Sequence, residues 1–354
     1  MSSNEPSEKT LNHQLDSNHP RQLRTGLIVL GCTIVLFYAG KSHPVILQKW
    51  YLHGLFQAWR IAYDYTLGLL PFPPALLLAG VFVWKFFRSK KYEFTWKLRL
   101  LRIFKSIVWG IILFIWLWGF HYASAPLVEN KSTILTDHQL FEWALEVQQR
   151  LNKNSSMARQ DIPEDELRLR LEAFLRTKDW PVLGRVRTRA WYDLGFIRYA
   201  GISGIYLPWF MEGHTSVRHP SEVLSFIRTH EMAHGYGISG EGEADYCAYM
   251  ALKIPMGNEW DQQAEWMADY ELWCKLRGIL INSSEPYLQQ LNQQMNAALM
   301  ATHQKVKEDD LHYRTASAKV AAISNDLYLK SMGIQDGIAN YDQMVVLVWQ
   351  DTPH

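Results

Sequence analysis

Three long apolar runs without a charged residue lie in the first 128 residues, and no run of comparable length follows them. They cover residues 25–40, 65–84 and 106–128, and the third is the most strongly apolar. A transmembrane helix needs about 20 apolar residues, and snorkelling of the flanking Arg24 and Lys41 can lengthen the short first run. We therefore predict three transmembrane helices within residues 25–128, preceded by a disordered polar tail, residues 1–24.

Two other interpretations of these runs remain open. The first run could be a cleavable signal peptide, although the polar segment before it is long and no A-x-A-like cleavage site follows it. The runs could also be buried helices of a soluble core. Their confinement to one end of the chain favours the membrane interpretation.

The loop between the second and third runs determines the predicted orientation. Residues 85–105 contain eight basic residues and only one acid, Glu93. Cytoplasmic loops are enriched in Lys and Arg, so this loop and the N-terminus are expected in the cytoplasm. We therefore expect a multi-pass protein of the inner membrane whose residues 41–64 and 129–354 lie outside the cytoplasm. Residues 41–64 also have apolar positions at helical spacing and are predicted to form a helix that can lie along the membrane interface.

The composition narrows the class of protein further. A net charge of +1 excludes a generally basic nucleic-acid binder, and no nucleic-acid partner is expected. Three cysteines cannot build a disulfide framework or a zinc ribbon. In an outer compartment Cys247 and Cys274 can either form one disulfide or remain buried free thiols.

The remainder, residues 129–354, is predicted to be a separate extracytoplasmic domain. Helical periodicity is expected over residues 137–151, 163–178, 258–278, 285–310, 312–331 and 341–349. The best strand candidate is residues 201–208, and residues 202–207, continued to Val217, are the candidate edge strand. The predicted fold class is α+β, mostly helical, with a small sheet.

One segment of this domain has the spacing of a metal site. His230 and His234 are four residues apart, so on a helix they share a face and can bind one metal ion. Two imidazoles suit Zn²⁺, which takes nitrogen ligands at about 2.0–2.1 Å. Glu231 follows about 100° round the helix, where it can reach a water activated by the metal. A surface helix with two solvated histidines is the alternative.

A catalytic zinc site needs a third protein ligand, which should follow closely. The glycines at 235, 237 and 240 can end the first helix and allow a tight reversal. A second helix beginning at Glu241 would place that carboxylate at the metal and Asp245 against a ligand histidine. Glu243 is the rival third ligand, but in an ideal helix it points about 200° away from Glu241.

The motif resembles the gluzincin branch of zinc metallopeptidases, in which H-E-x-x-H is followed by E-x-x-x-D. The resemblance implies that His230, His234 and Glu241 bind zinc and that Glu231 is the general base. The metzincin pattern also matches as far as Gly237, but its third ligand would fall on Gly240, which has no side chain. The implied fold is a zincin-like peptidase domain.

The whole chain also resembles an uncharacterised family of bacterial three-span membrane proteins with an H-E-x-x-H outer domain. The matching segments are residues 118–122, 201–208, 230–245, 328–330 and 337–341. That family typically has Asn where this chain has Asp245, and Gln where it has Gly235.

The resemblance implies hydrolysis of peptides or proteins outside the cytoplasm. An oxyanion donor is required, and Tyr270, His214 and Tyr206 are the candidates. In gluzincins the strand before the metal helix binds the substrate backbone, which would place Ile202, Ile205 and Tyr206 at the substrate edge. The charges around the motif exclude a site inside the bilayer.

Two alternatives to a peptidase remain open. The chain could be a zinc hydrolase of another bond, such as a cell-wall amidase. It could also be an inactive relative that binds a partner at the envelope, although the intact Glu231 disfavours this. The expected partners are a peptide or protein substrate and the lipid bilayer, and the sequence does not determine the oligomeric state.

Overall fold

The computed structural model describes residues 8–77, 80, 81, 84, 96–129, 133–191, 196–313, 315, 323, 324, 326, 327, 330 and 343–352. The chain divides into two compact units. The first is Met1–Ala125 with Pro208–Phe210, and the second is Pro126–Leu207 with Met211–His354. The first unit thus ends close to the boundary expected after residue 128.

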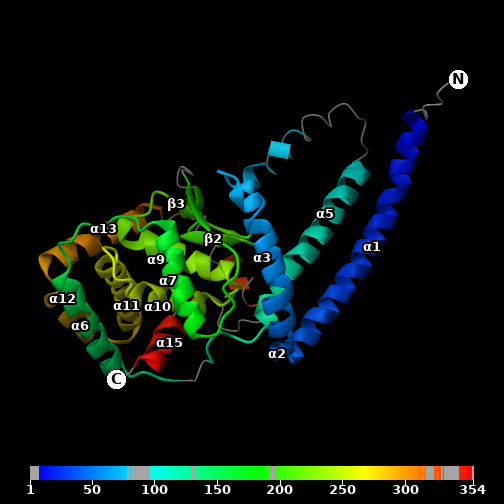
Figure 1. Ribbon diagram of the computed structural model, residues 1–354. Helices are drawn as coiled ribbons and strands as arrows, with labels where there is room; N and C mark the ends of the chain where they lie inside the picture. The colour runs from blue at the N-terminus through cyan, green and yellow to red at the C-terminus, as the bar shows by residue number, and fades with distance from the viewer. Residues whose placement is uncertain are drawn as a thin grey trace. The chain divides into compact units, whose positions relative to one another are not determined.

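Two long helices of the first unit, α1 (Glu8–Ser42) and α5 (Trp96–Leu117), lie side by side (Figure 1). Within them, Arg21–Ser42 and Leu100–Leu117 are long and apolar enough to cross a membrane. The two helices approach closely at Gly26, where a β-carbon would lie 3.2 Å from Val108. The indole of Trp116 also donates a hydrogen bond to Thr33 Oγ1, at 3.2 Å.

The described residues therefore contain two helices of spanning length, not the three expected. The predicted second span, residues 65–84, starts with a short 3₁₀ turn, η2 (Leu67–Leu69), followed by the extended Leu70. The prolines at 71, 73 and 74 explain this start, because a proline has no N–H to continue a helix from the preceding turn. Residues 78, 79, 82 and 83 lie outside the described part of the chain.

The helix boundaries also differ from the expected ones. Helix α1 begins at Glu8, inside the segment expected to be a disordered tail. Helix α5 begins ten residues before Ser106 and ends at Leu117, and the 3₁₀ turn η4 (Gly119–Ala123) follows.

The segment between α1 and the second apolar run is helical, as predicted. It consists of α2 (Pro44–Leu47), the π-helical turn η1 (Gln48–Phe56) and α3 (Gln57–Asp64). Leu52 and Phe56 are fully inaccessible, whereas Trp50 and Leu55 are exposed. The Tyr51 hydroxyl donates to the Trp116 carbonyl at 2.8 Å, which attaches this segment to the end of α5.

The second unit is built mainly from helices, as the periodicity predicted. Their bounds are α6 (Asp137–Lys153), α7 (Glu164–Thr177), α8 (Phe196–Tyr199), α9 (Ser221–Gly235), α10 (Glu241–Lys253), α11 (Asp261–Ser283), α12 (Glu285–Gln293), α13 (Ala297–Tyr313) and α15 (Gln343–Asp351). The expected helix at 285–310 is split because Asn296 caps α13, with its side-chain oxygen accepting from Leu299 N at 2.7 Å. Most of the predicted helix at 312–331 lies outside the described residues.

A three-stranded sheet completes this unit, in the order β1–β3–β2. The strands are β1 (Thr188–Trp191), β2 (Gly204–Leu207) and β3 (Glu212–Ser216). β3 is central, parallel to β1 and antiparallel to β2. One continuous edge strand reaching Val217 is therefore wrong: the turn η5 (Pro208–Phe210) separates β2 from β3, which become neighbours. The mostly helical α+β class with a small sheet is confirmed.

Helix α9 lies at the centre of the second unit. All three strands pack against it, and α7, α10 and α11 cover its other sides (Figure 1). Its second half is buried on every face, with Met232 and Ala233 fully inaccessible. A helix buried all round is held by the elements that pack against it, so its polar side chains are positioned by several neighbours at once.

Candidate metal centre

The C-terminus of α9 has a specific turn that positions the second histidine. Gly237 adopts φ +90°, the left-handed conformation that favours glycine. The Gly237 N–H donates to the His234 carbonyl at 2.8 Å, and the Ile238 N–H donates to the Ala233 carbonyl at 3.2 Å. This is a Schellman motif. It turns the Ile238 carbonyl back towards the helix, where it accepts a hydrogen bond from His234 Nδ1 at 2.7 Å.

Both histidines of the motif are oriented through their Nδ1 atoms. His230 Nδ1 donates a hydrogen bond to Asp245 Oδ1 at 2.7 Å, and His234 Nδ1 donates to the Ile238 carbonyl. These partners assign the tautomers and leave both Nε2 atoms with a lone pair. The two Nε2 atoms are only 3.1 Å apart, yet neither can donate to the other while both rings are neutral.

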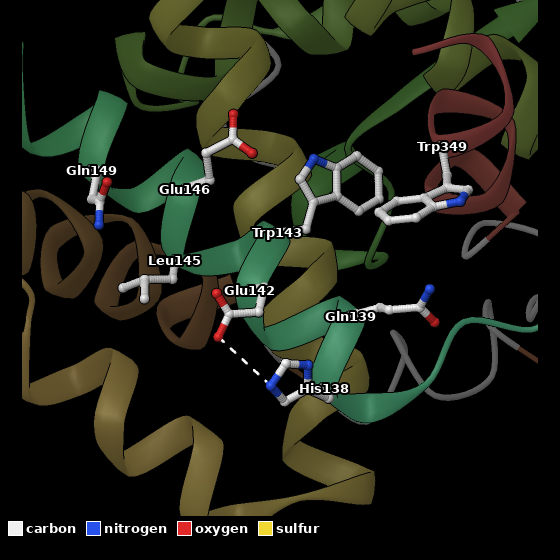
Figure 2. Close-up of a pocket in the computed structure, with 8 residues that line it drawn as sticks. All are labelled: His138, Gln139, Glu142, Trp143, Leu145, Glu146, Gln149 and Trp349. Atoms are coloured by element: carbon white, nitrogen blue, oxygen red, sulfur yellow. Dashed lines mark ion pairs between the residues drawn. The ribbon is translucent and has the colours of Figure 1, made fainter. Parts of the chain in front are cut away.

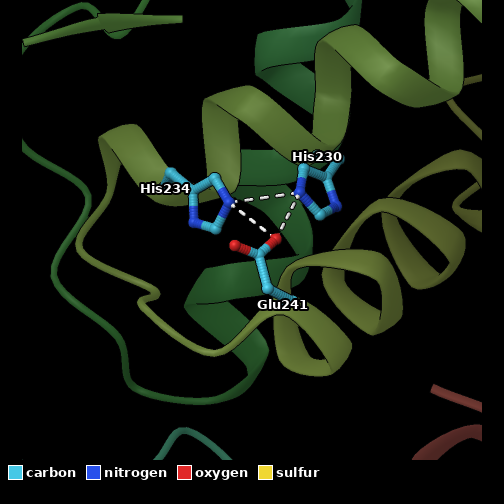
Figure 3. A group of neighbouring side chains, drawn as sticks. All are labelled: His230, His234 and Glu241. Atoms are coloured by element: carbon cyan, nitrogen blue, oxygen red, sulfur yellow. Dashed lines mark hydrogen bonds and ion pairs between the residues drawn. The ribbon is translucent and has the colours of Figure 1, made fainter. Parts of the chain in front are cut away.

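Glu241 completes a group of three donor atoms (Figure 3). Its Oε2 lies 3.2 Å from His230 Nε2 and 3.4 Å from His234 Nε2. A tetrahedral zinc ion with bonds of about 2.0–2.1 Å holds its ligand atoms about 3.3–3.4 Å apart. Two imidazole nitrogens and one carboxylate oxygen at these separations therefore fit a zinc ion in chemistry and in spacing.

The position of Glu241 follows from the start of α10. Gly240 precedes the helix in an extended conformation, so Glu241 is its first residue and turns towards α9. Burial alone would raise the pKa of Glu241, but His234 and His230 hold that pKa well below its usual value. Burial would likewise lower the pKa of His234, but the Glu241 carboxylate raises it. Protons and a metal ion therefore compete for the same nitrogen atoms.

Glu243, the rival third ligand, lies elsewhere. Its Oε1 accepts hydrogen bonds from the backbone N–H groups of Leu127, at 2.8 Å, and Val128, at 3.3 Å. Burial raises the pKa of Glu243 to about 7, and those two donors partly oppose the rise. The expected rotation of Glu243 away from Glu241 on α10 accounts for this placement. Glu243 anchors the first residues of the second unit instead of joining the three donor atoms.

Asp245 takes the place that the spacing predicted and has a second partner that the sequence analysis missed. Its Oδ2 lies 2.7 Å from Lys275 Nζ, on α11. Burial would raise the pKa of Asp245, but Lys275 and His230 lower it. Glu271, one turn earlier on α11, lies 3.9 Å from the same ammonium.

The Glu231 carboxyl lies under the sheet. It is 4% exposed, and its Oε2 has no hydrogen-bond partner among the described residues. A β-carbon on Gly204 of β2 would lie 2.8 Å from Glu231 Cγ, and one on Gly213 of β3 would lie 2.6 Å from Glu231 Cβ. Burial raises the pKa of Glu231 to about 7, although the neighbouring histidines oppose the rise.

The strand register separates the oxyanion candidates. Gly204 and Tyr206 are two residues apart on β2 and therefore face the same side, towards α9. The Tyr206 ring lies 6.3 Å from the His234 ring. His214 directly follows Gly213 on β3, so its side chain points to the opposite face. The alternation therefore does not favour His214 as a donor to a substrate at this centre.

The oxyanion candidate Tyr270 and the predicted substrate-edge residues lie at different distances from the donor group. Tyr270 stacks on Trp266, and its hydroxyl lies 3.2 Å from His303 Nδ1 on α13. None of the hydrogen bonds described for the three donor atoms involves Tyr270. Ile205 faces away from α9 by the alternation of β2, and Ile202 precedes the strand. Of the predicted substrate-edge residues, only Tyr206 shares the face of Glu231.

The residues that the sequence analysis missed come from other elements. Gly204, Gly213 and Lys275 contact the motif from β2, β3 and α11. Glycines inside short strands were the only available signal, since they often mark a close approach of another group. A lysine inside a long helix carries no comparable signal.

A pocket of about 430 Å³ lies elsewhere on the second unit (Figure 2). It is lined by α6 residues from His138 to Gln149 and by Trp349 of α15, and none of the motif residues contributes to it.

Cys247 and Cys274 are both free thiols in this structure. Of the two expectations for this pair, a disulfide or two free thiols, the second therefore holds.

Comparison with known proteins gives one match. Residues 51–349 match a family model described as "Protein of unknown function (DUF3810)". The chain matches no curated protein and no solved structure. The family match includes α9, α10, the sheet and most of the first unit. Because it covers well over half of the chain, the protein belongs to this DUF3810 family.

Proposed function

We propose that this protein is a membrane-anchored, zinc-dependent peptidase with a zincin-like outer domain. The observation that carries the proposal is the donor group: His230 Nε2, His234 Nε2 and Glu241 Oε2 lie 3.1–3.4 Å apart, with a buried Glu231 on the same helix turn. Three protein ligands with a carboxylate beside them match the needs of a hydrolytic zinc site, which keeps its fourth position for water or substrate.

His230, His234 and Glu241 would hold the zinc ion. A zinc ion bound there would supply a Lewis acid for a peptide carbonyl and lower the pKa of a water molecule to about 7. Glu231 would take the proton of the attacking water and deliver it to the leaving amine. A carboxyl whose pKa is raised to about 7 is suited to both transfers near neutral pH.

The sheet would orient the substrate. β2 has β3 as its neighbour on one side in the described sheet, so an extended peptide can add as a strand along its other edge. Tyr206 projects from this strand towards α9, which makes its hydroxyl the best-placed donor to the oxyanion of the tetrahedral species. The substrate would thus be held by backbone hydrogen bonds, as suits a peptide.

The proposal includes the membrane topology. The helical segments Arg21–Ser42 and Leu100–Leu117 would span the bilayer, and the apolar run at 65–84 would add the third span. The basic loop at 85–105 would then be cytoplasmic, and the peptidase domain would lie outside, in the periplasm of a double-membraned cell. The natural substrate would be a peptide or protein of that compartment.

Metal content and activity test this function together. The detergent-solubilised protein is expected to contain about one zinc ion per chain and to cleave peptides from a mixed library, with loss of activity on chelation. Glu231→Gln should retain zinc and lose cleavage, because only the proton acceptor changes. His230→Ala/His234→Ala should lose both, and His138→Ala on the surface of α6 should lose neither.

The outcomes separate the alternatives. Equal zinc content in the wild type and the His230→Ala/His234→Ala variant would overturn the metal site. Zinc binding with hydrolysis of muropeptides, but of no ordinary peptide, would assign another zinc hydrolase. Zinc binding with no Glu231-dependent hydrolysis of either library would assign a binding protein.

A further inference from the structure

Asp245 is shared between a metal-binding histidine and a lysine from another helix. Its Oδ1 lies 2.7 Å from His230 Nδ1, and its Oδ2 lies 2.7 Å from Lys275 Nζ. The Asp245 side chain is 7% exposed and that of Lys275 is 14% exposed, so both charges lie largely out of water. The two contacts use different oxygens of the carboxylate.

A buried carboxylate must be compensated before it can orient a histidine. Removing an ionised carboxylate from water is unfavourable unless an opposite charge or several donors face it. His230 offers Asp245 one N–H, and that ring must remain neutral to bind a metal through Nε2. The full positive charge facing Asp245 is therefore supplied by Lys275, across the contact between α10 and α11.

We infer that Lys275 is a positioning residue of the zinc site: it holds the Asp245 carboxylate against His230 Nδ1, and thereby raises the affinity of the site for zinc. The inference rests on the proposed function, since it concerns the same metal. It predicts a chain of contacts running from Lys275 through Asp245 to His230, with no direct contact between the lysine and the metal.

A second lysine provides a matched control. Lys253 on α10 lies 2.7 Å from Glu265 and 3.2 Å from Asp269, both on α11. It joins the same two helices, also to a buried aspartate, since Asp269 is 2% exposed. Its partners touch none of the three donor atoms. Asp269 also accepts from Arg150 Nε at 2.8 Å, so the control removes an interhelical ion pair and leaves its aspartate paired.

The test is the zinc affinity of the full-length protein in detergent, measured by competition with a chromophoric chelator. Lys275→Met is expected to weaken zinc binding by about 10- to 100-fold, as changes to the partners of ligand histidines do. Lys275→Arg retains the charge and should recover most of the affinity. Lys253→Met should bind zinc as the wild type does, and its metal-free thermal midpoint should fall less than that of Lys275→Met, because Arg150 still faces Asp269.

A double variant shows whether Lys275 acts through Asp245. Asp245→Asn should weaken zinc binding, and Asp245→Asn/Lys275→Met should be no weaker than Asp245→Asn alone. This double variant removes the Asp245 charge together with the lysine that faces it, so it keeps the test usable if Lys275→Met fails to fold. Losses that add, or unchanged affinity in Lys275→Met, would overturn the inference while leaving the zinc site intact. A wild type that binds no zinc would instead overturn the proposed function.

Discussion

The carboxylate of Glu231 occupies space that exists because two strand residues have no side chain. Gly204 and Gly213 lie where a β-carbon would approach Glu231 Cγ and Cβ to within 3 Å. The general base proposed here is thus held by its own helix on one side and by the backbone of β2 and β3 on the other. Its rotamer is fixed by packing, which is what a proton acceptor aimed at one water requires.

Gly204→Ala should therefore reduce kcat by about 10- to 100-fold while zinc content stays near that of the wild type, because a displaced general base typically contributes about 10²–10⁴-fold. Gly278→Ala is the matched control, since a β-carbon at Gly278 on α11 has no atom within 4 Å. The measurement is kcat against zinc stoichiometry for both variants. Unchanged kcat in Gly204→Ala would show that the strand does not restrain Glu231.

His214 gives the folded state a pH dependence of its own. Burial lowers the pKa of His214 to about 4, with Arg189 adding to the effect. In the unfolded chain its pKa is near the ordinary value of about 6.5. The unfolded state therefore binds the proton first as the pH falls from about 6.5 to 4, and the folded state loses stability over that window.

We expect this histidine to remove about 2 kcal/mol of unfolding free energy between pH 7 and pH 5. His214→Gln should reduce the fall in thermal midpoint between these two pH values, and His138→Gln, at an exposed position on α6, should not. Equal pH dependence in the wild type and His214→Gln would contradict this prediction.

At the scale of elements, the site is a junction of two helix ends. The Schellman turn that ends α9 supplies the Ile238 carbonyl to His234, and the first residue of α10 supplies Glu241. The turn between them spans only residues 236–240. A short connection fixes the relative position of the helices, so the spacing of the three donor atoms depends on the backbone of this turn.

Gly237→Ala should weaken zinc binding and destabilise the fold by about 1–2 kcal/mol, because a left-handed conformation is unfavourable for alanine. Gly257→Ala is matched in strain, since Gly257 has φ +73° and no neighbour within 4 Å. Both variants should lower the thermal midpoint, but only Gly237→Ala should change the zinc affinity. Equal zinc affinities in Gly237→Ala and Gly257→Ala would show that the turn does not position the metal ligands.

At the scale of the whole molecule, the proposed topology depends on whether the apolar run at 65–84 forms a span. Two helices of spanning length are described, and the apolar run at 65–84 would be the third. With three spans, residues 50 and 92 lie on opposite sides of the membrane. With only the two described spans, residues 50 and 92 lie on the same side.

Alkaline phosphatase fusions, which are active only outside the cytoplasm, distinguish these topologies. Fusions after residues 50 and 133 should be active and a fusion after residue 92 inactive, because residues 85–105 carry the excess of basic residues that retains a loop in the cytoplasm. Equal phosphatase activity of the fusions after residues 50 and 92 would show that residues 65–84 do not cross the membrane. A cytoplasmic residue 133 would contradict the outer location of the domain.

Local patterns in the sequence predicted most of the helices of the second unit and the relative directions of the candidate metal ligands. The 3.6-residue period predicted the helices around Leu140, Leu167 and Trp266, and the i, i+4 spacing predicted that His230 and His234 share a face. The same period separated Glu241 from Glu243. These features depend on residues a few positions apart, whose relative directions follow from backbone geometry alone.

Contacts between residues far apart in the sequence could be seen only in the tertiary structure. The face on which His214 lies depends on strand register, and the close approach of Gly204 to Glu231 depends on the sheet packing against α9. Lys275 lies thirty positions after Asp245 in the chain and reaches it because α11 packs against α10. The sequence by itself therefore determined most of the helices and the spacing of the three donor residues. Only the folded chain decided which distant residues surround that spacing, because such contacts arise from packing and not from local periodicity.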